Sequence, residues 1–275
     1  MKSGVSSANT RGPVVLVSRA IGFTFPLSYA YLAGHLKACG EDVRILFRSP
    51  TGAKSEALVR EIMALKPLLV GFGNLYPELE DIRLIIAALG DAGRDFPVAI
   101  GGQMVSPIPE FAVTVTGADI GVIGEGEIVL QQIVAALREG RDVADIGGLA
   151  VRQGERVTLT GPGEFFEDLS NLPRVPYELF PTEQWLPVGR WYAEHIIQPH
   201  WRYRDRVVNV HGGRGCPYRC NFCYHHSKPR YRALPEMMAE AAEGLERFDA
   251  TMLYFSDDLA ICTPARAEQL AAEIA

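Results

Sequence analysis

The sequence predicts an α/β fold in two units, each built on parallel strands. Short apolar segments alternate with helical segments from residue 13 to about residue 160, and a second alternation begins at residue 207. Between them, residues 161–206 are rich in proline and tryptophan, which indicates a packed connector. The chain is 48% hydrophobic, which is enough for a sizeable core.

The first unit repeats a strand and a helix five times. Gly40 follows the first helix and Pro67 follows the second, and both residues mark helix ends. The expected strands are residues 14–18, 43–47, 68–72, 98–100 and 120–123, and the expected helices are residues 26–38, 55–65, 78–89, 107–115 and 128–137. Because such strands are apolar almost throughout, we expect a Rossmann-like (flavodoxin-like) doubly wound parallel sheet with helices on both faces.

The ends of the first unit are less regular. Residues 1–12 are polar and are expected to form a disordered N-terminus, so the domain spans residues 13–160. Residues 149–159 alternate around Gly154, which predicts a small hairpin at the sheet edge. The linker, residues 161–206, contains prolines that break any long helix and all three tryptophans of the chain.

The second unit, residues 207–275, opens with a strand over residues 207–210 whose carboxyl end delivers a cysteine-containing loop. An amphipathic helix follows over residues 234–248, then a strand over residues 251–255, and a last helix begins near residue 264. This order predicts the first βα units of a partial TIM-type barrel, a fold in which active sites lie at the carboxyl ends of the strands.

Three cysteines, Cys216, Cys220 and Cys223, occupy one loop with the spacing C-x3-C-x2-C; we call residues 214–224 the cysteine loop. Glycines before the first cysteine and Pro217 inside the loop oppose a continuous helix, which would align three buried thiols on one face. Three thiolates can hold an iron–sulfur cluster and leave one iron open to a small molecule. The loop therefore predicts a cluster with chemistry at the open iron.

Two alternatives to a cluster remain open at this point. His226 would complete a tetrahedral Cys3His zinc site, and three inert buried thiols are the other possibility. The chain contains five cysteines, an odd number that suits a metal site better than a disulfide framework. Cys39 and Cys262 stand apart and are expected to be small buried side chains.

Charge and hydropathy exclude several classes of protein. The net charge is −6, so no bulk basic character indicates nucleic-acid binding. No apolar run reaches membrane-spanning length, and the polar N-terminus does not read as a signal peptide. We therefore expect a cytoplasmic protein with reduced thiols and with neither nucleic acid nor a membrane as partner.

The cysteine spacing, with an aromatic residue before the last cysteine, resembles the radical S-adenosylmethionine (SAM) superfamily. The resemblance implies that Cys216, Cys220 and Cys223 ligate a 4Fe-4S cluster whose open iron binds SAM. It also implies an electron donor such as a flavodoxin or ferredoxin, cleavage of SAM to a 5'-deoxyadenosyl radical, and a small-molecule substrate. Neither the substrate nor further catalytic residues are specified by the sequence.

The same resemblance implies SAM-binding residues near the cysteine loop. Phe222 and Tyr224 lie where adenine is usually contacted. Asp257 or Asp258, which follow the second strand, would accept the SAM amino group. Core packing remains an alternative for Phe222, and a turn remains an alternative for the two aspartates.

Glycines follow two strands of the first unit, with Gly101 and Gly102 after the fourth and Gly124-Glu125-Gly126-Glu127 after the fifth. Ligands of parallel sheets bind beyond the carboxyl ends of the strands, although paired glycines are also ordinary turn residues. The arrangement is similar to the cobalamin-binding domain that precedes the barrel in many radical SAM enzymes. That resemblance implies that Gly101, Gly102, Gly124 and Glu125 line a corrinoid.

One departure from the cobalamin-binding pattern concerns the lower ligand of the cobalt. The D-x-H-x-x-G signature is absent from the first loop, residues 18–23, and His35 lies inside a predicted helix. A cobalamin bound here would therefore not be histidine-ligated. The glycines also lack the Lys-Ser or Lys-Thr of a P-loop and the G-x-G-x-x-G of a dinucleotide fingerprint.

Two functional hypotheses follow. The first is a radical SAM enzyme that carries out cobalamin-dependent methyl transfer or related carbon-centred radical chemistry. The second is a non-catalytic module that binds a corrinoid, a labile iron–sulfur cluster or zinc. Because the sequence supplies only two strand–helix units of the barrel, we expect the N-terminal portion of a longer enzyme, truncated within the barrel, with little turnover by itself.

Overall fold

The computed structural model describes residues 4–19, 25–48, 55–73, 76–186, 206–224 and 227–274. The chain forms two compact units, and each is described by itself below. The first unit comprises Met1–Ala20, Ser28–Phe165 and Pro173–Leu179, and the second comprises Ile21–Leu27, Phe166–Leu172 and Phe180–Ala275. The predicted linker, residues 161–206, thus contributes segments to both units.

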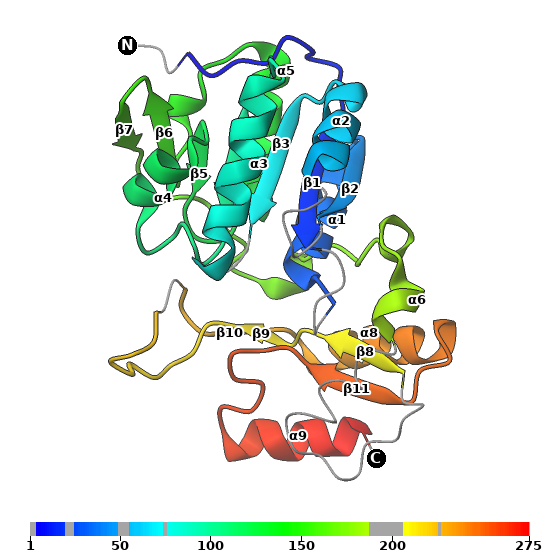
Figure 1. Cartoon of the computed structure of the whole chain (residues 1–275). Helices are drawn as coiled ribbons and strands as arrows, with labels where there is room; N and C mark the ends of the chain where they lie inside the picture. Colours follow the sequence, from blue (N-terminus) through cyan, green and yellow to red (C-terminus); the bar gives the residue numbers. More distant parts are fainter. Residues whose placement is uncertain are drawn as a thin grey trace. The chain divides into compact units, whose positions relative to one another are not determined.

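The first unit contains a seven-stranded sheet with the order β2-β1-β3-β4-β5-β6-β7 (Figure 1). Its strands are β1 (Val14–Arg19), β2 (Val43–Arg48), β3 (Leu69–Gly73), β4 (Val98–Gly101), β5 (Ile120–Val122), β6 (Leu149–Gln153) and β7 (Arg156–Leu159). Strands β1 to β5 pair in parallel, and β6 and β7 add an antiparallel hairpin to β5. The predicted doubly wound parallel sheet with a hairpin at its edge is confirmed.

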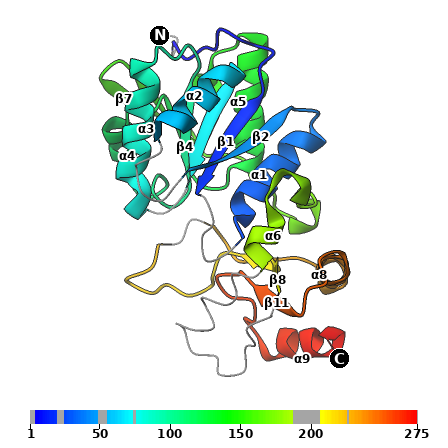
Figure 2. The ribbon, with the colours of Figure 1, turned by 45° about the vertical axis from the view of Figure 1, so that its right-hand side comes forward.

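Helices cover both faces of this sheet. Helices α2 (Ser55–Leu65), α3 (Leu79–Asp91) and α4 (Pro109–Thr116) lie on one face, and α1 (Leu27–Ala38) and α5 (Glu127–Glu139) lie on the other (Figures 1 and 2). Short 3-10 turns are η1 (Tyr76–Glu78), η2 (Val143–Asp145) and η4 (Tyr177–Leu179). This layering explains why β1, β3, β4 and β5 are apolar on both sides, since these strands are buried almost throughout between the two helix layers.

Helix α3 shows how the sequence pattern produces this packing. Ile82, Ile86 and Leu89 recur at helical spacing and are buried in the core. The opposite side of the helix is charged, where Arg83 and Glu80 form an exposed ion pair at 2.7 Å. Burying one such aliphatic side chain contributes about 1.5–3 kcal/mol, so the apolar stripe fixes the face that packs.

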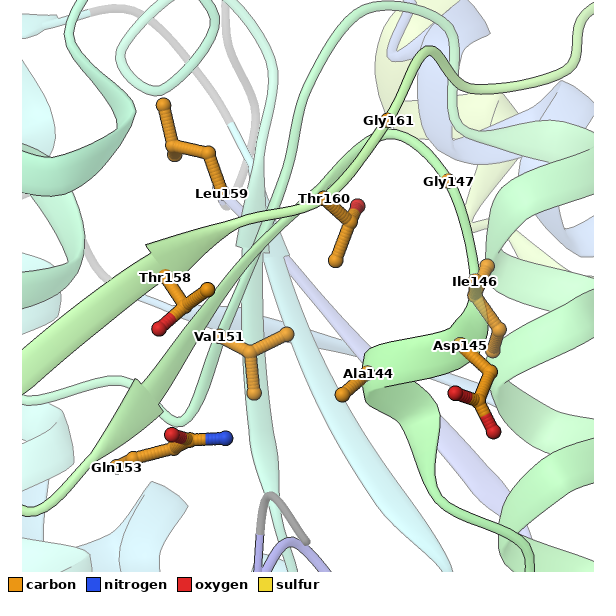
Figure 3. A pocket seen from close by; sticks show the side chains of 10 residues that line it. All are labelled: Ala144, Asp145, Ile146, Gly147, Val151, Gln153, Thr158, Leu159, Thr160 and Gly161. Atoms are coloured by element: carbon orange, nitrogen blue, oxygen red, sulfur yellow. The ribbon is translucent and has the colours of Figure 1, made fainter. Parts of the chain in front are cut away.

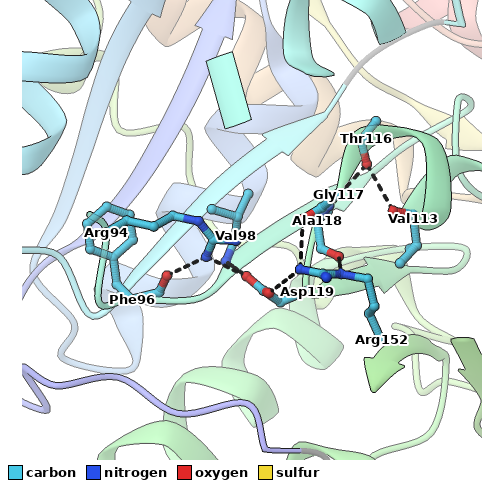
Figure 4. Close-up of polar contacts among 9 residues, drawn as sticks. All are labelled: Arg94, Phe96, Val98, Val113, Thr116, Gly117, Ala118, Asp119 and Arg152. Atoms are coloured by element: carbon cyan, nitrogen blue, oxygen red, sulfur yellow. Dashed lines mark hydrogen bonds and ion pairs between the residues drawn. The ribbon is translucent and has the colours of Figure 1, made fainter. Parts of the chain in front are cut away.

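A polar network joins the amino ends of β4 and β5 to the hairpin (Figure 4). Asp119, just before β5, accepts hydrogen bonds from Arg94 Nη1 at 2.6 Å and from the Val98 backbone nitrogen at 2.8 Å. Its other oxygen, Oδ1, accepts from Arg152 Nη2 at 2.9 Å. Arg152 also donates to the Ala118 carbonyl at 2.7 Å. One carboxylate therefore connects three neighbouring segments of the sheet.

The second unit pairs β8 (Val207–Val210) in parallel with β11 (Met252–Phe255), and β9 (Gly213–Arg214) antiparallel with β10 (Arg230–Tyr231). Its other elements are η3 (Leu169–Asn171), α6 (Thr182–Trp185), α8 (Leu234–Arg247) and α9 (Pro264–Ile274). The two strand–helix units predicted for this region, β8 with α8 and β11 with α9, are present. Asn209 Nδ2 donates to Ser256 Oγ at 2.9 Å and adds a side-chain link between the two strands.

Helix α8 packs against strand β8. Met237, Ala241 and Gly244 are buried on one side of the helix, while its mean hydropathy is close to neutral because the other side is charged. A side chain at Gly244 would place its Cβ 2.8 Å from Val208 Cγ1. The glycine, which costs helix stability, therefore permits the close approach of helix and strand.

Cys39 was expected to be buried, and this expectation is wrong, because the residue is exposed. Helix α1 ends at Ala38, and Gly40 turns the chain with a φ of +87°. Lys37 and Ala38 are exposed as well, so the whole end of α1 faces solvent. The Cys39 Sγ lies 3.9 Å from His35 Nε2.

The described part of residues 1–12, predicted to be disordered, makes defined hydrogen bonds within the first unit. Asn9 Nδ2 donates to the Lys66 carbonyl at 2.7 Å, and Arg138 Nη1 donates to the Thr10 carbonyl at 2.6 Å. Among the described residues, helices long and apolar enough to cross a membrane are absent.

The network around Asp119 predicts a large effect of one substitution. Asp119→Ala leaves two guanidinium groups and a backbone N–H without their acceptor, so we expect a loss of about 2–4 kcal/mol in the free energy of unfolding. Chemical denaturation followed by circular dichroism measures it. Asp91→Ala, at the exposed end of α3, is the matched control and is expected to change stability by less than about 0.5 kcal/mol. Equal effects of the two substitutions would contradict the assigned role.

Candidate functional site

The first group of predicted site residues lies at the carboxyl edge of the first sheet. Gly73 ends β3 and is paired in register with Gly101, which ends β4. Gly102 and Gly124 have φ values of +82° and +83°, in the left-handed region that favours glycine. A Cβ placed on Gly124 would meet no atom within 4 Å, so open space lies beside this backbone. The edge thus offers a ligand close access to the main chain.

Ser106 joins the two glycine loops and was missed by the sequence reasoning. Its buried hydroxyl donates to the Gly102 carbonyl at 3.2 Å and accepts from the Gly124 backbone nitrogen at 3.0 Å. The loops after β4 and β5 are therefore linked by one side chain. Ser106 lies 18 residues before Gly124, and no local sequence pattern predicts a contact between them.

Glu125 and Glu127 lie where the chain passes from β5 into α5. Glu125 is half-buried, and Glu127 is buried in the first turn of the helix, where the helix dipole favours a carboxylate. Burial lowers the pKa of His35, and the negative charge of Glu127 partly opposes this. His35 lies in the last turn of α1, near enough to the start of α5 to feel the charge of Glu127.

Two buried side chains, Arg48 and Tyr29, hold the carboxyl ends of β1, β2 and β3. The sequence analysis did not predict either contact. Arg48, at the end of β2, is 3% exposed and forms ion pairs with Glu78 and, at 3.3 Å, with Asp81. The Tyr29 hydroxyl donates to the Val17 carbonyl at 2.9 Å and accepts from the Gly73 nitrogen at 2.7 Å; burial raises its pKa to about 12. Residues 20–24 and 74–75 of the adjoining loops lie outside the described residues.

The second group of predicted site residues is carried by the cysteine loop. The loop is closed at its base by the pairing of β9 with β10, and we call these two strands the neck. Gly215 has a φ of +75°, and its Cβ would lie 2.7 Å from the carbonyl oxygens of Ser227 and Lys228. The chain at the start of the cysteine loop is therefore in close backbone contact with residues 227–228, and only glycine fits there.

The three cysteines of the loop are free thiols. Cys216 is half-buried, while Cys220 and Cys223 are exposed, and the Cys223 nitrogen donates to the Cys220 carbonyl at 3.1 Å. Within the described residues, no three His, Cys, Asp or Glu side chains are gathered as a ready-made metal site. The donor set suits a cluster chemically, but its sulfurs have not converged. His226, the fourth ligand of the zinc alternative, lies outside the described residues.

The aromatic residues of the loop face solvent. Phe222 is 88% exposed, so the core-packing alternative for this residue is wrong. Tyr218 and Tyr224 are also exposed. Exposed rings of this size have much apolar area to bury, and a planar aromatic ligand such as a base is a suitable partner.

Asp257 lies beside the backbone that leads into the cysteine loop. Its Oδ1 accepts hydrogen bonds from the backbone nitrogens of Gly212, at 2.8 Å, and Gly213. Its Oδ2 is buried and has no hydrogen-bond partner in the described part of the chain. Burial raises the pKa of Asp257 to about 6, against the lowering effects of those N–H groups and of Arg266. The second oxygen is thus available to a cationic group, whereas Asp258 is exposed.

A separate pocket of about 310 Å³ lies in the first unit between η2 and the hairpin (Figure 3). Thr158, Thr160, Val151 and Ala144 are among the side chains that surround it. The residues predicted to bind cofactors do not line this pocket.

Comparison with known protein families identifies the first unit. Residues 13–134 match the family model described as the B12 binding domain. The anaerobic magnesium-protoporphyrin IX monomethyl ester cyclase of Rubrivivax gelatinosus is 30% identical over 203 residues, 72% of this chain and 34% of that protein. An uncharacterized methyltransferase of Pyrococcus horikoshii is 25% identical over 209 residues, 75% of this chain and 42% of that protein. The chain therefore spans less than half the length of these curated relatives.

Solved structures share the fold of both units. The radical SAM methyltransferase TsrM from Kitasatospora setae, with cobalamin and a [4Fe-4S] cluster bound, superposes with a TM-score of 0.70 at 23% identity, covering 95% of this chain and 50% of that one. The cobalamin-dependent SAM radical enzyme OxsB superposes with a TM-score of 0.70 at 16% identity, covering 96% of this chain and 37% of that one. At 23% and 16% sequence identity, these similarities show a shared fold and nothing more specific.

The hydroxyl of Ser106 predicts a local change in dynamics. Ser106→Ala removes the acceptor of the Gly124 N–H, so we expect faster hydrogen exchange of that amide, with a loss of about 1 kcal/mol in local protection. Exchange followed by NMR or mass spectrometry measures it. Ser170→Ala, on η3 of the second unit, is the control that leaves Gly124 unchanged. Unaltered exchange at Gly124 in Ser106→Ala would argue against the link between the loops.

Proposed function

We propose that this chain, whose residues 13–134 are a B12-binding domain and whose fold is that of cobalamin-dependent radical SAM methyltransferases, is a radical SAM enzyme. Its reaction is cobalamin-dependent methyl transfer, or related carbon-centred radical chemistry, on a small-molecule substrate. One observation carries the proposal: a B12-binding domain and a loop of three free cysteines after the first strand of the second unit occur on one chain.

Cys216, Cys220 and Cys223 are the residues that would hold a 4Fe-4S cluster. When bound, such a cluster supplies the electron that cleaves SAM to a 5'-deoxyadenosyl radical. The neck holds the chain on both sides of the loop, and the three free thiols, two of them exposed, can close on the metal. Because a metal site that is not preformed gains its order on binding, we expect the loop to become ordered with the cluster.

SAM would be bound by groups around the same loop. The free Oδ2 of Asp257 is a suitable acceptor for the SAM ammonium, because a buried carboxylate oxygen without a donor gains most from a cation. The exposed rings of Phe222 and Tyr224 are suitable for contact with adenine. Asp258 remains a second, exposed candidate for the ammonium.

The corrinoid would lie on the carboxyl edge of the first sheet, lined by Gly101, Gly102, Gly124 and Glu125. Support comes from the left-handed glycines, from the open space at Gly124 and from the family match of this unit. Bound cobalamin supplies methyl-transfer chemistry at its cobalt. The lack of the D-x-H-x-x-G signature in residues 18–23 supports binding without a histidine lower ligand.

Two further parts of the proposal concern the cellular setting. We propose a low-potential electron donor such as a flavodoxin or ferredoxin, because reduction of the cluster requires an electron from outside. We also propose the cytoplasm as the compartment, because the five free cysteines need reducing conditions.

A second candidate function is a non-catalytic module that binds a corrinoid and a labile cluster or zinc. It is favoured by one observation, that within the described residues the thiols are not gathered into a metal site. The following experiments separate the two candidates.

The first experiment tests radical SAM chemistry. Protein reconstituted anaerobically with iron and sulfide is reduced and incubated with SAM, and 5'-deoxyadenosine is measured. The enzyme proposal predicts 5'-deoxyadenosine, and predicts that Cys216→Ala, Cys220→Ala and Cys223→Ala each abolish it. Cys39→Ala and Cys262→Ala, outside the loop, are the matched controls and retain it. A bound cluster without any SAM cleavage would support the non-catalytic module instead.

The second experiment tests corrinoid binding. Hydroxocobalamin is titrated into the protein and its absorption spectrum is followed. Gly124→Leu places a side chain in the open space at the edge. We therefore expect the affinity for hydroxocobalamin to fall at least about tenfold, which corresponds to about 1.4 kcal/mol of binding free energy. Gly140→Leu is the matched control, since Gly140 has a φ of +67° and open space but caps the far end of α5. Equal affinities of both variants and the wild type would refute this corrinoid site.

A further inference from the structure

We infer that Asp257 is a positioning residue for the metal site, because its carboxylate holds the backbone at the base of the cysteine loop. The inference rests on the proposed function, since it presumes that the loop takes up a cluster. It gives Asp257 a structural role through Oδ1 that is separate from any contact of Oδ2 with SAM.

The peptide groups around Gly212 are held from both sides. Their N–H groups, those of Gly212 and Gly213, donate to Asp257 Oδ1. The Gly212 carbonyl accepts from the Arg232 backbone nitrogen at 2.8 Å and from Arg266 Nη2 at 3.2 Å. Three segments that are distant in sequence, those after β11, after β10 and in α9, therefore meet on one short stretch of chain.

Steric contacts restrict the same stretch. A Cβ on Gly212 would lie 2.5 Å from Met237 Sδ, and a Cβ on Gly213 would lie 2.6 Å from the Tyr231 ring. The Arg266 guanidinium lies 4.6 Å from the centre of that ring. The backbone is thus enclosed by α8, β10 and α9, and glycine at both positions avoids these close contacts.

Strand pairing brings Asp257 to the loop. Strand β11 pairs with β8 in the register Phe255 to Val210, and the Ser256 nitrogen donates to the Val210 carbonyl at 2.9 Å. Two positions beyond these strand ends, Asp257 and Gly212 lie side by side, although they are 45 residues apart in the sequence. The second strand–helix unit therefore supports the loop that the first unit carries.

A carboxylate is well suited to this position. After β8 the backbone N–H groups leave the strand pairing and need another acceptor, and one carboxylate oxygen can accept both. Two adjacent N–H groups that share one acceptor oxygen have their peptide orientations fixed together. Partners outside the ligand shell typically contribute about 10- to 100-fold to metal affinity by fixing the ligands' approach.

The two roles of Asp257 are separable by substitution. Asparagine keeps an acceptor oxygen for the two N–H groups and loses the negative charge. Alanine loses both. Holding the loop needs only the acceptor, whereas binding an ammonium needs the charge, so Asp257→Asn retains the first role and lacks the second.

The test is retention of the cluster by the full chain. Wild type, Asp257→Ala, Asp257→Asn and Asp258→Asn are reconstituted anaerobically, and iron and sulfide are measured during titration with an iron chelator. We expect Asp257→Ala to lose its cluster at about tenfold less chelator than the wild type, and both asparagine variants to match the wild type. Hydrogen exchange at the Gly212 and Gly213 amides is the second readout, and it is expected to accelerate in Asp257→Ala alone.

The outcomes separate this inference from the proposed function. If the wild type takes up no cluster, the proposed function fails, and the exchange rates still test whether Asp257 holds the loop. If Asp257→Ala retains its cluster and its protected amides, the inference is overturned and the function stands. Loss in Asp257→Asn equal to that in Asp257→Ala would also overturn it, because charge rather than the acceptor would then matter.

A further variant tests the inference if Asp257→Ala fails to fold. Arg266→Ala removes the donor to the Gly212 carbonyl from the other side and leaves Asp257 in place. The inference predicts easier loss of the cluster in this variant too, in the same direction as in Asp257→Ala. Unchanged retention in a folded Arg266→Ala protein would contradict a held loop base.

Discussion

Parallel strand pairing is the constraint on which the rest of the structure depends. Parallel strands point the same way, so their carboxyl ends share an edge, and residues distant in sequence meet there. In the first unit this edge collects Gly73, Gly101 and Gly124 from three neighbouring strands. In the second unit it brings Asp257, after β11, to the glycines that follow β8. In each unit the candidate site is therefore formed by segments that are distant from one another in the sequence.

The two sites use the same physical arrangement. Glycines provide backbone that a ligand or a neighbouring chain segment can approach closely, and one polar side chain holds that backbone. Ser106 does this for the glycine loops of the first unit, and Asp257 for the base of the cysteine loop. The residues expected to touch cofactors, the thiols and Phe222 among them, remain accessible. In both sites the supporting backbone is held in place, while the groups that would face a ligand remain accessible.

Apolar periodicity was sufficient to predict most of the fold, while the contacts that build the sites could not be predicted. The strand at 207–210 and the helix at 55–65 have the predicted bounds, because apolar periodicity sets the elements and Pro67 ends the helix. Ser106 with Gly124, and Asp257 with Gly212, depend on strand register across 18 and 45 residues. Cys39 was misplaced because the end of α1, rather than its periodicity, sets the exposure of that residue.

The central claim is that three thiols hold a cluster with one iron open to SAM. Electron paramagnetic resonance of the reduced, reconstituted protein with and without SAM tests it most directly. The account predicts an iron–sulfur signal that shifts when SAM is added, because SAM binds the open iron. A signal indifferent to SAM, or protein that takes up zinc and no iron, would contradict it.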